Sequence, residues 1–439
     1  MINPLFVTSS RGGPMVLAVL FALFGNHLAF AQSTQAWSLR QSIQRVLEVA
    51  PETRISAAQL KSRQADLSQA LAWPNPEISL RADEKLGIDD GKGGIDLTNF
   101  SITQPLPLGR LARRGKVAEA NLMAAQANSQ QQQLYLEHAT ALVFHHLQLT
   151  QANFHLAQQQ LKLAQDYRQK KRNGHRDPLV RYLTPLEKQR LNIMYETANQ
   201  ALSTAEGKYE EARARFTSLL QLDTQNKLTV TDLKPVSRTA DLHSLEQQLQ
   251  THASLLTRQR KLDAARAGID ASRDVNRADP TLTVFRERDY LAGRRTDYNG
   301  IVLGIQIPLW QSQKNYMAKA KAKRDEALAQ LQSTQRDLSA HLHQSYTHLG
   351  HVIGQARNHR QNLLRPAKQV LELSRRGFAS GELNLLALID ANNTYFGARR
   401  HYFELMQRAL MEAAELRLAA GLSYLDNNQD VITWGVKHD

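Results

Sequence analysis

The chain of 439 residues has no cysteine, only 13 prolines and 22 glycines, and an aromatic content of 6%. Without cysteine it cannot form disulfides, cysteine-ligated zinc or iron–sulfur sites, a thiol nucleophile or a thioether-linked lipid. The scarcity of glycine and aromatic residues argues against a large all-β protein or an enzyme built on glycine-rich loops. The apolar content of 42% is enough for a core, so the composition favours long helices.

Basic residues outnumber acidic ones, 55 to 41, which gives a formal net charge of +14. Such a charge is compatible with nucleic acid or with an acidic membrane surface as a partner. The compartment that the chain reaches decides between them.

The N-terminus has the three parts of a secretory signal peptide. Arg11 is its charged residue, Pro14–Phe24 is apolar, and Ala29-Phe30-Ala31 fits the small-residue cleavage pattern. The apolar run is shorter than the ~20 residues that cross a membrane as a helix, which disfavours a membrane anchor. We therefore expect residues 1–31 to be a signal peptide on an exported protein that is not a lipoprotein and has no nucleic-acid partner.

Two elements open the region after the signal. Apolar residues at three- and four-residue spacing predict helix over 32–72, with a break near Pro51. Trp73-Pro-Asn-Pro76 stops this helix, because proline lacks an amide donor and restricts the preceding residue. Alternating apolar and polar residues over about 76–104 then predict a β-hairpin.

A helical hairpin over about 110–220 and a compact segment at 221–241 complete this half. Nothing interrupts the first arm, Arg110–Arg172, which would be roughly 95 Å long. This helix carries two apolar series with a seven-residue repeat, whereas a two-stranded coiled coil needs only one seam. Two seams suit a helix with neighbours on both sides. The core of a helical bundle also fits the pattern. The series are Leu142, Leu149, Leu156 and Leu163, and Leu147, Phe154 and Leu161.

The same order of elements returns in residues 242–439, after about 200 residues, which indicates an internal duplication. We expect a helix over about 242–275, a β-hairpin over about 280–308 and a helical hairpin over about 313–420. The first arm of that hairpin is predicted as one rod, Gln313–Arg376. The chain thus divides into repeat 1, residues 32–241, and repeat 2, residues 242–439, which ends in a C-terminal tail.

Four amphipathic strands cannot close a barrel, yet a membrane tolerates no open sheet edge in its hydrocarbon. Three chains would supply twelve strands, an even number within the range of outer-membrane barrels. The fold class expected is therefore mainly α with a transmembrane β-barrel. A soluble coiled-coil protein carrying two hairpins remains the alternative.

Motifs at the hairpin ends resemble those of the TolC-like outer-membrane efflux factors, in particular the CzcC-like branch associated with heavy-metal cation export. They are Trp73-Pro-Asn-Pro-Glu77, Gln104-Pro-Leu-Pro-Leu-Gly-Arg110, Leu303-Gly-Ile-Gln-Ile-Pro-Leu-Trp310 and Gly381-Glu-Leu-Asn-Leu-Leu-Ala-Leu-Ile-Asp-Ala391. Each motif alone is weak, whereas their order, spacing and duplication are specific. The resemblance covers almost all of the chain after the signal peptide.

This resemblance implies a homotrimer with a twelve-stranded barrel in outer-membrane lipid, on an α-helical tunnel in the periplasm. It also implies a mixed belt, which we place at 221–241 and after Gly421. The protein would be a passive duct of a tripartite system, joined by a periplasmic membrane-fusion adaptor to an inner-membrane pump of the resistance–nodulation–division type. Its cargo would be heavy-metal cations. Alternatives are a drug-efflux or secretion duct of the same architecture, or a soluble periplasmic structural or adaptor protein.

The resemblance also assigns the tips of the two helical hairpins to adaptor docking and to narrowing of the tunnel. Gly174 and Asp177 fall on the first tip, and Gly381 and Asn384 on the second. A basic cluster crowds the first tip and is either a solvated surface or a salt-sensitive docking surface. It comprises Arg168, Lys170, Lys171, Arg172, Arg176 and Arg181.

No catalytic or cofactor-binding pattern is recognisable, so neither an enzyme nor a bound cofactor is expected. The 15 histidines raise the question of a metal site, because imidazole is a common ligand. His348 and His351 are three residues apart on one helix and are candidates for transient metal contacts, although polar packing between helices is the favoured explanation. We predict no resident metal.

Overall fold

The computed structural model describes residues 36–82, 97–172, 184–223, 228–274, 279–291, 294–307, 313–426 and 432–434. All of them belong to one unit, residues 36–439. The predicted signal peptide, residues 1–31, lies outside the described residues. No helix in the described ranges is both long enough and apolar enough to cross a membrane.

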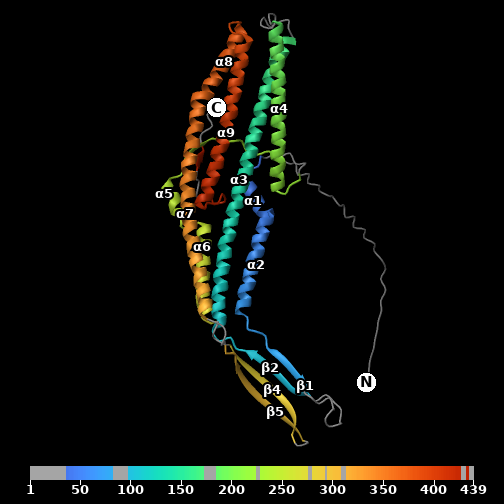
Figure 1. The fold of residues 1–439 in the computed structure, drawn as a ribbon. Helices are drawn as coiled ribbons and strands as arrows, with labels where there is room; N and C mark the ends of the chain where they lie inside the picture. The colour runs from blue at the N-terminus through green and yellow to red at the C-terminus, as the bar shows by residue number, and fades with distance from the viewer. Residues whose placement is uncertain are drawn as a thin grey trace, which may run out of the picture. The chain divides into compact units, whose positions relative to one another are not determined.

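Four helices make up the first half: α1 (Leu39–Val49), α2 (Pro51–Leu71), α3 (Arg110–Arg172) and α4 (Pro185–Leu219) (Figure 1). Their ends follow local rules. Ser38 and Gln41 form a capping box at the start of α1. Pro51 begins α2, where its missing amide needs no partner. The predicted break near Pro51 is confirmed, and α3 covers the range in which the sequence predicts an unbroken helix.

The second half contains α5 (Leu242–Leu249), α6 (Ala253–Ser272), α7 (Gln313–His359), α8 (Arg365–Ser380) and α9 (Leu385–Ala420). The helix predicted over 242–275 is in fact two, because α6 begins afresh after His252. The ring Nδ1 of His252 accepts a hydrogen bond from the Ser254 amide, at 3.1 Å, and so caps α6.

The predicted rod Gln313–Arg376 is also interrupted. A π-helical turn, Arg360–Leu364, separates α7 from α8. Pro366 follows it, and a proline ring clashes with the carbonyl four residues back in an α-helix. Here that carbonyl belongs to Asn362, inside the π turn, where the wider winding accommodates the proline.

The four long strands form one antiparallel sheet in the order β1-β2-β4-β5. They are β1 (Glu77–Ala82), β2 (Leu97–Pro105), β4 (Pro280–Leu291) and β5 (Arg294–Ile305). The two hairpins, about 200 residues apart in the chain, meet where β2 pairs with β4. The sheet extends from one end of the helices (Figure 1).

A smaller sheet joins two segments that the sequence assigns to the belt. β3 (Val236–Thr239) pairs antiparallel with β6 (Ile432–Trp434). Upstream, Trp37 forms an isolated parallel bridge with Val230. The pairing brings residues 236–239 and 432–434 together, and β3 packs against α7 and α9.

Helix α3 packs against α2 and α4 and, separately, against α6 and α9. The predicted contacts on two sides of this helix are thus confirmed. Phe144 and Leu147 of α3 lie in one apolar cluster with Phe216 of α4. A second cluster joins α7 to α9 through Leu342, Leu349 and Leu410.

Candidate functional sites on the sheet and at the helix tip

One face of the four-stranded sheet is apolar and exposed in the part nearest the helices, whereas charged residues such as Arg286 and Asp297 follow on the same face towards the far end of β4 and β5. The cross-strand register places Ile78, Ile102, Val284 and Ile301 in one row, because side chains on paired residues share a face. We call this the apolar sheet face, and its exposed residues are Ile78, Leu80, Phe100, Ile102, Val284, Ile301, Leu303 and Ile305. Leu303 is 76% exposed and Ile301 70%. A contiguous apolar surface of this kind marks contact with protein or lipid.

The opposite face of the same sheet is mostly polar. The hydroxyls of Thr103 and Thr283 lie 2.8 Å apart across β2 and β4. The Asn99 amide donates to the Glu287 carboxylate at 3.1 Å. This polar face can stay hydrated while the other meets an apolar phase, as the alternation along membrane barrel strands requires.

Two strands of the sheet have a hydrogen-bonded neighbour on one side only. Among the described strands, β1 and β5 are the edges of the order β1-β2-β4-β5. Each edge presents a row of backbone donors and acceptors to any further strand. Both edges therefore have backbone groups available for pairing with a further strand.

The sheet is fastened to the helices by charge pairs and backbone bonds. Arg110 at the start of α3 pairs with Asp279 before β4, at 2.7 Å. Arg113 pairs with the buried carboxylate of Asp274, after α6. The Leu106 amide donates to the Pro280 carbonyl at 2.8 Å. The residues that leave the first hairpin are thus held to those that enter the second.

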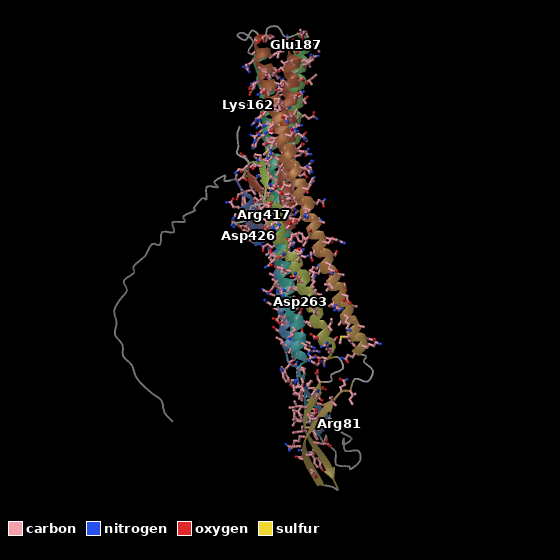
Figure 2. The ribbon with its side chains drawn as sticks, turned by 90° about the vertical axis from the view of Figure 1, so that its left-hand side faces the viewer. Arg81, Lys162, Glu187, Asp263, Arg417 and Asp426 are labelled. Atoms are coloured by element: carbon pink, nitrogen blue, oxygen red, sulfur yellow. The ribbon has the colours of Figure 1, made fainter. Side chains whose placement is uncertain are left out.

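The turn between α8 and α9 lies at the end of the helices away from the sheet, as does Glu187 near the start of α4 (Figures 1 and 2). Gly381 ends α8 with φ +81°, a left-handed conformation that favours glycine. Asn384 caps α9, because its side-chain oxygen accepts from the Ala387 amide at 3.0 Å. Two of the four predicted tip residues therefore shape one tight turn, whereas Gly174 and Asp177 lie outside the described residues.

A buried apolar cluster supports this turn from below. Leu385 and Leu388 of α9 are fully buried against Leu371 of α8 and Leu191 of α4. The two helical hairpins are therefore packed together close to the tip. A rigid base of this kind holds the turn in place.

Exposed apolar side chains next to the tip were missed in the sequence reasoning. Val370 and Leu373 on α8, Leu386 on α9, and Leu186 and Ile193 on α4 are all exposed. Leu186 and Ile193 are seven residues apart, so they lie on the same side of α4. Their spacing can be recognised in the sequence, but only the structure shows that these side chains are exposed and not part of the core.

The histidine pair does not form a metal site in this structure. His348 contacts Glu412 of α9 through Nδ1, at 3.0 Å, whereas His351 is exposed. Over the described part of the chain, no three histidine, aspartate or glutamate residues are grouped to hold a metal ion.

Other polar side chains connect the helices. His138 Nε2 of α3 lies 3.1 Å from the Glu415 carboxylate of α9, and this contact lowers the pKa of Glu415. Glu415 also borders a cavity of about 460 Å³ between α3, α6, α7 and α9. His145 is buried, and loss of hydration lowers its pKa to about 4 despite a hydrogen bond with Gln148. It is therefore neutral at pH 7 and serves packing.

Comparisons with known proteins agree with this geometry. The profile of a family described as "Outer membrane efflux protein" matches residues 42–221 and again 244–422. The cobalt-zinc-cadmium resistance protein CzcC of Cupriavidus metallidurans is 22% identical over 375 residues, which is 82% of this chain and 84% of that protein. The nickel-cobalt-cadmium resistance protein NccC of Alcaligenes xylosoxydans is 34% identical over 142 residues, 30% of this chain and 32% of that protein.

A solved structure shares the fold. The structure of CusC, described in terms of folding and transmembrane channel formation, superposes with a TM-score of 0.70. The match covers 88% of this chain and 92% of CusC at 16% identity.

Proposed function

Because this chain belongs to the outer membrane efflux protein family, we propose that it forms an outer-membrane channel that passively conducts heavy-metal cations from the periplasm to the exterior. The family is one of efflux proteins, not of enzymes, so the task is conduction rather than catalysis. The observation that carries the proposal is the exposed apolar sheet face between two open edges.

Closure of the barrel would come from three copies of the chain. Each copy brings four strands in the order β1-β2-β4-β5, and the outer edges β1 and β5 would pair with neighbouring copies. Twelve strands without an edge would leave no backbone group unpaired in hydrocarbon. The apolar sheet face would then meet lipid, and the polar face would line the water-filled interior.

The division into a signal peptide, residues 1–31, and two repeats, residues 32–241 and 242–439, is part of this proposal. Two matches to one family profile, in residues 42–221 and 244–422, support the duplication. The similar helix ends at Gln221 and Gly421 support it as well, because both adopt positive φ.

The energy for transport would come from partner proteins, because a passive duct has no energy source of its own. We propose a periplasmic membrane-fusion adaptor that joins the channel to an inner-membrane pump of the resistance–nodulation–division type. The docking surface would be the helix tips, with Gly174 and Asp177 on one and Gly381 and Asn384 on the other. The exposed Leu186 and Leu386 beside the tip would add apolar contact.

The cargo is proposed from the relatives. CzcC and NccC carry names that state resistance to cobalt, cadmium, and zinc or nickel. His348 and His351 would at most contact passing cations, because a conduit needs weak binding.

Deletion of the gene tests the cargo. We expect lower tolerance to zinc, cobalt, nickel and cadmium salts, restored by the plasmid-borne gene, and unchanged tolerance to hydrophobic drugs. Lower tolerance to drugs alone would replace the metal duct by a drug duct. Fractionation tests the compartment, since a processed protein found only in the soluble periplasm would rule out a channel.

A further inference from the structure

The first turns of α3 and α7 and the end of α6 form a basic surface beside the sheet. Arg110 and Arg113 belong to the first turn of α3, and both are engaged by aspartates. Arg273 at the end of α6 is also paired, with Asp270. These ion pairs hold the elements together, so the charge available to a partner must come from other residues.

Four further basic residues, which we call the junction belt, are Arg114, Lys116, Lys314 and Lys319. All four are exposed, and among the described residues no ion pair to a carboxylate involves them. Lys116 and Lys319 each lie six residues after the start of their helix, which is about 9 Å along the axis. The junction belt thus presents net positive charge within about one Debye length of the sheet.

Large exposed apolar and aromatic side chains lie at the level of the junction belt and next to the sheet. Trp73 precedes β1, Leu108 links β2 to α3, Ile307 follows β5, and Tyr316 is in the first turn of α7. Trp73 is 60% exposed and Tyr316 45%. Tryptophan and tyrosine favour the boundary between hydrocarbon and headgroups. The apolar sheet face would therefore match the hydrocarbon of a bilayer, the aromatic rings its interface, and the basic side chains its headgroups.

We propose that the junction belt binds the phosphate groups of anionic phospholipids in the membrane leaflet that faces the helices. The inference rests on the proposed function, since these residues meet lipid only if the sheet is embedded. Two observations select lipid over an acidic protein: continuity with the apolar sheet face, and the aromatic residues at the same level. Long lysine side chains reach the headgroups while their stems lie on apolar surface.

The charge of the junction belt makes its lipid binding distinguishable from a purely apolar contact, which any lipid would satisfy. Each basic residue near an anionic surface is worth about fivefold in apparent affinity, the equivalent of about 1 kcal/mol. The attraction falls with salt, because the Debye length drops from about 10 Å at 0.1 M to about 3 Å at 1 M. An apolar contact alone would show neither dependence.

The test uses the full chain reconstituted in vesicles of phosphatidylethanolamine, alone or with one quarter phosphatidylglycerol. Lipids retained through purification in mild detergent are quantified by mass spectrometry. The wild type is expected to retain phosphatidylglycerol above its share of the bilayer at 0.1 M salt and to lose this enrichment at 1 M. In the variant Lys116→Gln/Lys314→Gln/Lys319→Gln the ratio of retained phosphatidylglycerol to phosphatidylethanolamine is expected to be at least fivefold lower than in the wild type.

The matched control removes the same charge from exposed lysines elsewhere on the helices, as Lys162→Gln/Lys188→Gln/Lys368→Gln. It should retain phosphatidylglycerol as the wild type does. Equal enrichment in the wild type and the belt variant, or equal loss in belt variant and control, would overturn the proposal. Loss of adaptor binding in the belt variant with normal lipid enrichment would assign the surface to a protein instead.

The outcomes separate this inference from the proposed function. If the wild type inserts in neither vesicle, judged by flotation and protection from protease, the channel proposal itself fails. If it inserts in both and retains lipid without regard to charge, only the junction belt proposal is overturned.

Discussion

Gln221 and Gly421 end α4 and α9 with similar left-handed turns, at φ +51° and +74°. Beyond each, the next amide folds back to the helix: Leu222 N donates to the Thr217 carbonyl at 3.1 Å, and Leu422 N to that of Arg417 at 2.9 Å. These are matching Schellman-type caps. The two helix ends therefore match in backbone geometry, in keeping with the proposed duplication, although only one of the two positions is a glycine.

Replacing Gln221 by glycine should stabilise the protein. A side chain in the left-handed region costs roughly 1–2 kcal/mol, part of which is offset by the greater freedom of glycine in the unfolded chain. We expect Gln221→Gly to raise the free energy of unfolding by about 0.5–1 kcal/mol, measured by thermal unfolding in detergent. Gly421→Ala should do the opposite, because its Cβ would come within 2.7 Å of the His252 ring.

Glu137 holds the chain that follows α9. Its carboxylate is 1% exposed and accepts hydrogen bonds from the Ser423 hydroxyl at 2.9 Å and from the Tyr424 amide at 2.7 Å. Arg417, at the end of α9 (Figure 2), donates to the Ser423 carbonyl at 2.7 Å. Glu137→Gln turns an amide group toward these donors and should lower stability by about 1–3 kcal/mol.

Limited proteolysis provides the second measurement for Glu137→Gln. Cleavage after residue 420 should become faster, because the segment loses its attachment to α3. The exposed Glu119 of the same helix supplies the control, and Glu119→Gln should leave both stability and cleavage unchanged. A Glu137→Gln protein with wild-type cleavage would contradict a role in fastening this segment.

His145 should make stability depend on pH. Burial lowers its pKa from 6.5 to about 4, so between these values the unfolded chain binds more protons than the folded one. Stability from this group is complete above pH 6.5 and is lost as pH falls towards 4, by about 3 kcal/mol in total. Burial lowers the pKa of His252 as well, so it acts in the same direction.

Unfolding midpoints between pH 4 and 7 measure this effect. His145→Gln should flatten the curve over that range, because a group that does not titrate replaces the imidazole. An identical slope in wild type and His145→Gln would show that His145 does not take up a proton on unfolding.

If the tip docks the proposed adaptor, Gly381→Pro should impair docking or channel opening while the proposed trimer remains intact. Proline fixes φ near −65°, whereas Gly381 adopts +81°, so the turn must change shape. Gly397→Ala in the middle of α9 is the control, because a Cβ there meets nothing within 4 Å. Pull-down with the adaptor and native electrophoresis give the two measurements, and loss of the trimer in Gly381→Pro would assign the turn to folding.

Charge on the two sheet faces should have unequal effects. Ile301→Lys would place a cation on the apolar sheet face, at a cost of about 2–4 kcal/mol near the bilayer centre. Ser101→Lys, on the polar face, should be tolerated because that face is expected to meet water. Heat stability of the trimer in outer-membrane extracts gives the comparison, and equal stability of both variants would contradict the assigned lipid face.

The tertiary structure corrected two predictions for physical reasons. The prediction of one rod over Gln313–Arg376 did not take Pro366 into account, and this proline is accommodated by the π turn Arg360–Leu364. The prediction of one helix over 242–275 did not take His252 into account. The ring of His252 caps α6, and its Nε2 lies 3.2 Å from the Leu418 carbonyl of α9. Both residues are visible in the sequence, but the second acts through a contact with a distant helix.

The sequence by itself determined the order of elements, the length of α3 and the faces of the strands. These depend on local signals: apolar periodicity, prolines that stop helices, and alternation along strands. The tertiary structure alone decided which of those faces stay uncovered and which distant segments meet. β3 pairs with β6, and β2 with β4, through long-range hydrogen bonds that no local pattern specifies. Within the described part of the chain, Ile301 and Leu303 stay largely exposed, and the lipid contact proposed for the apolar sheet face depends on that exposure.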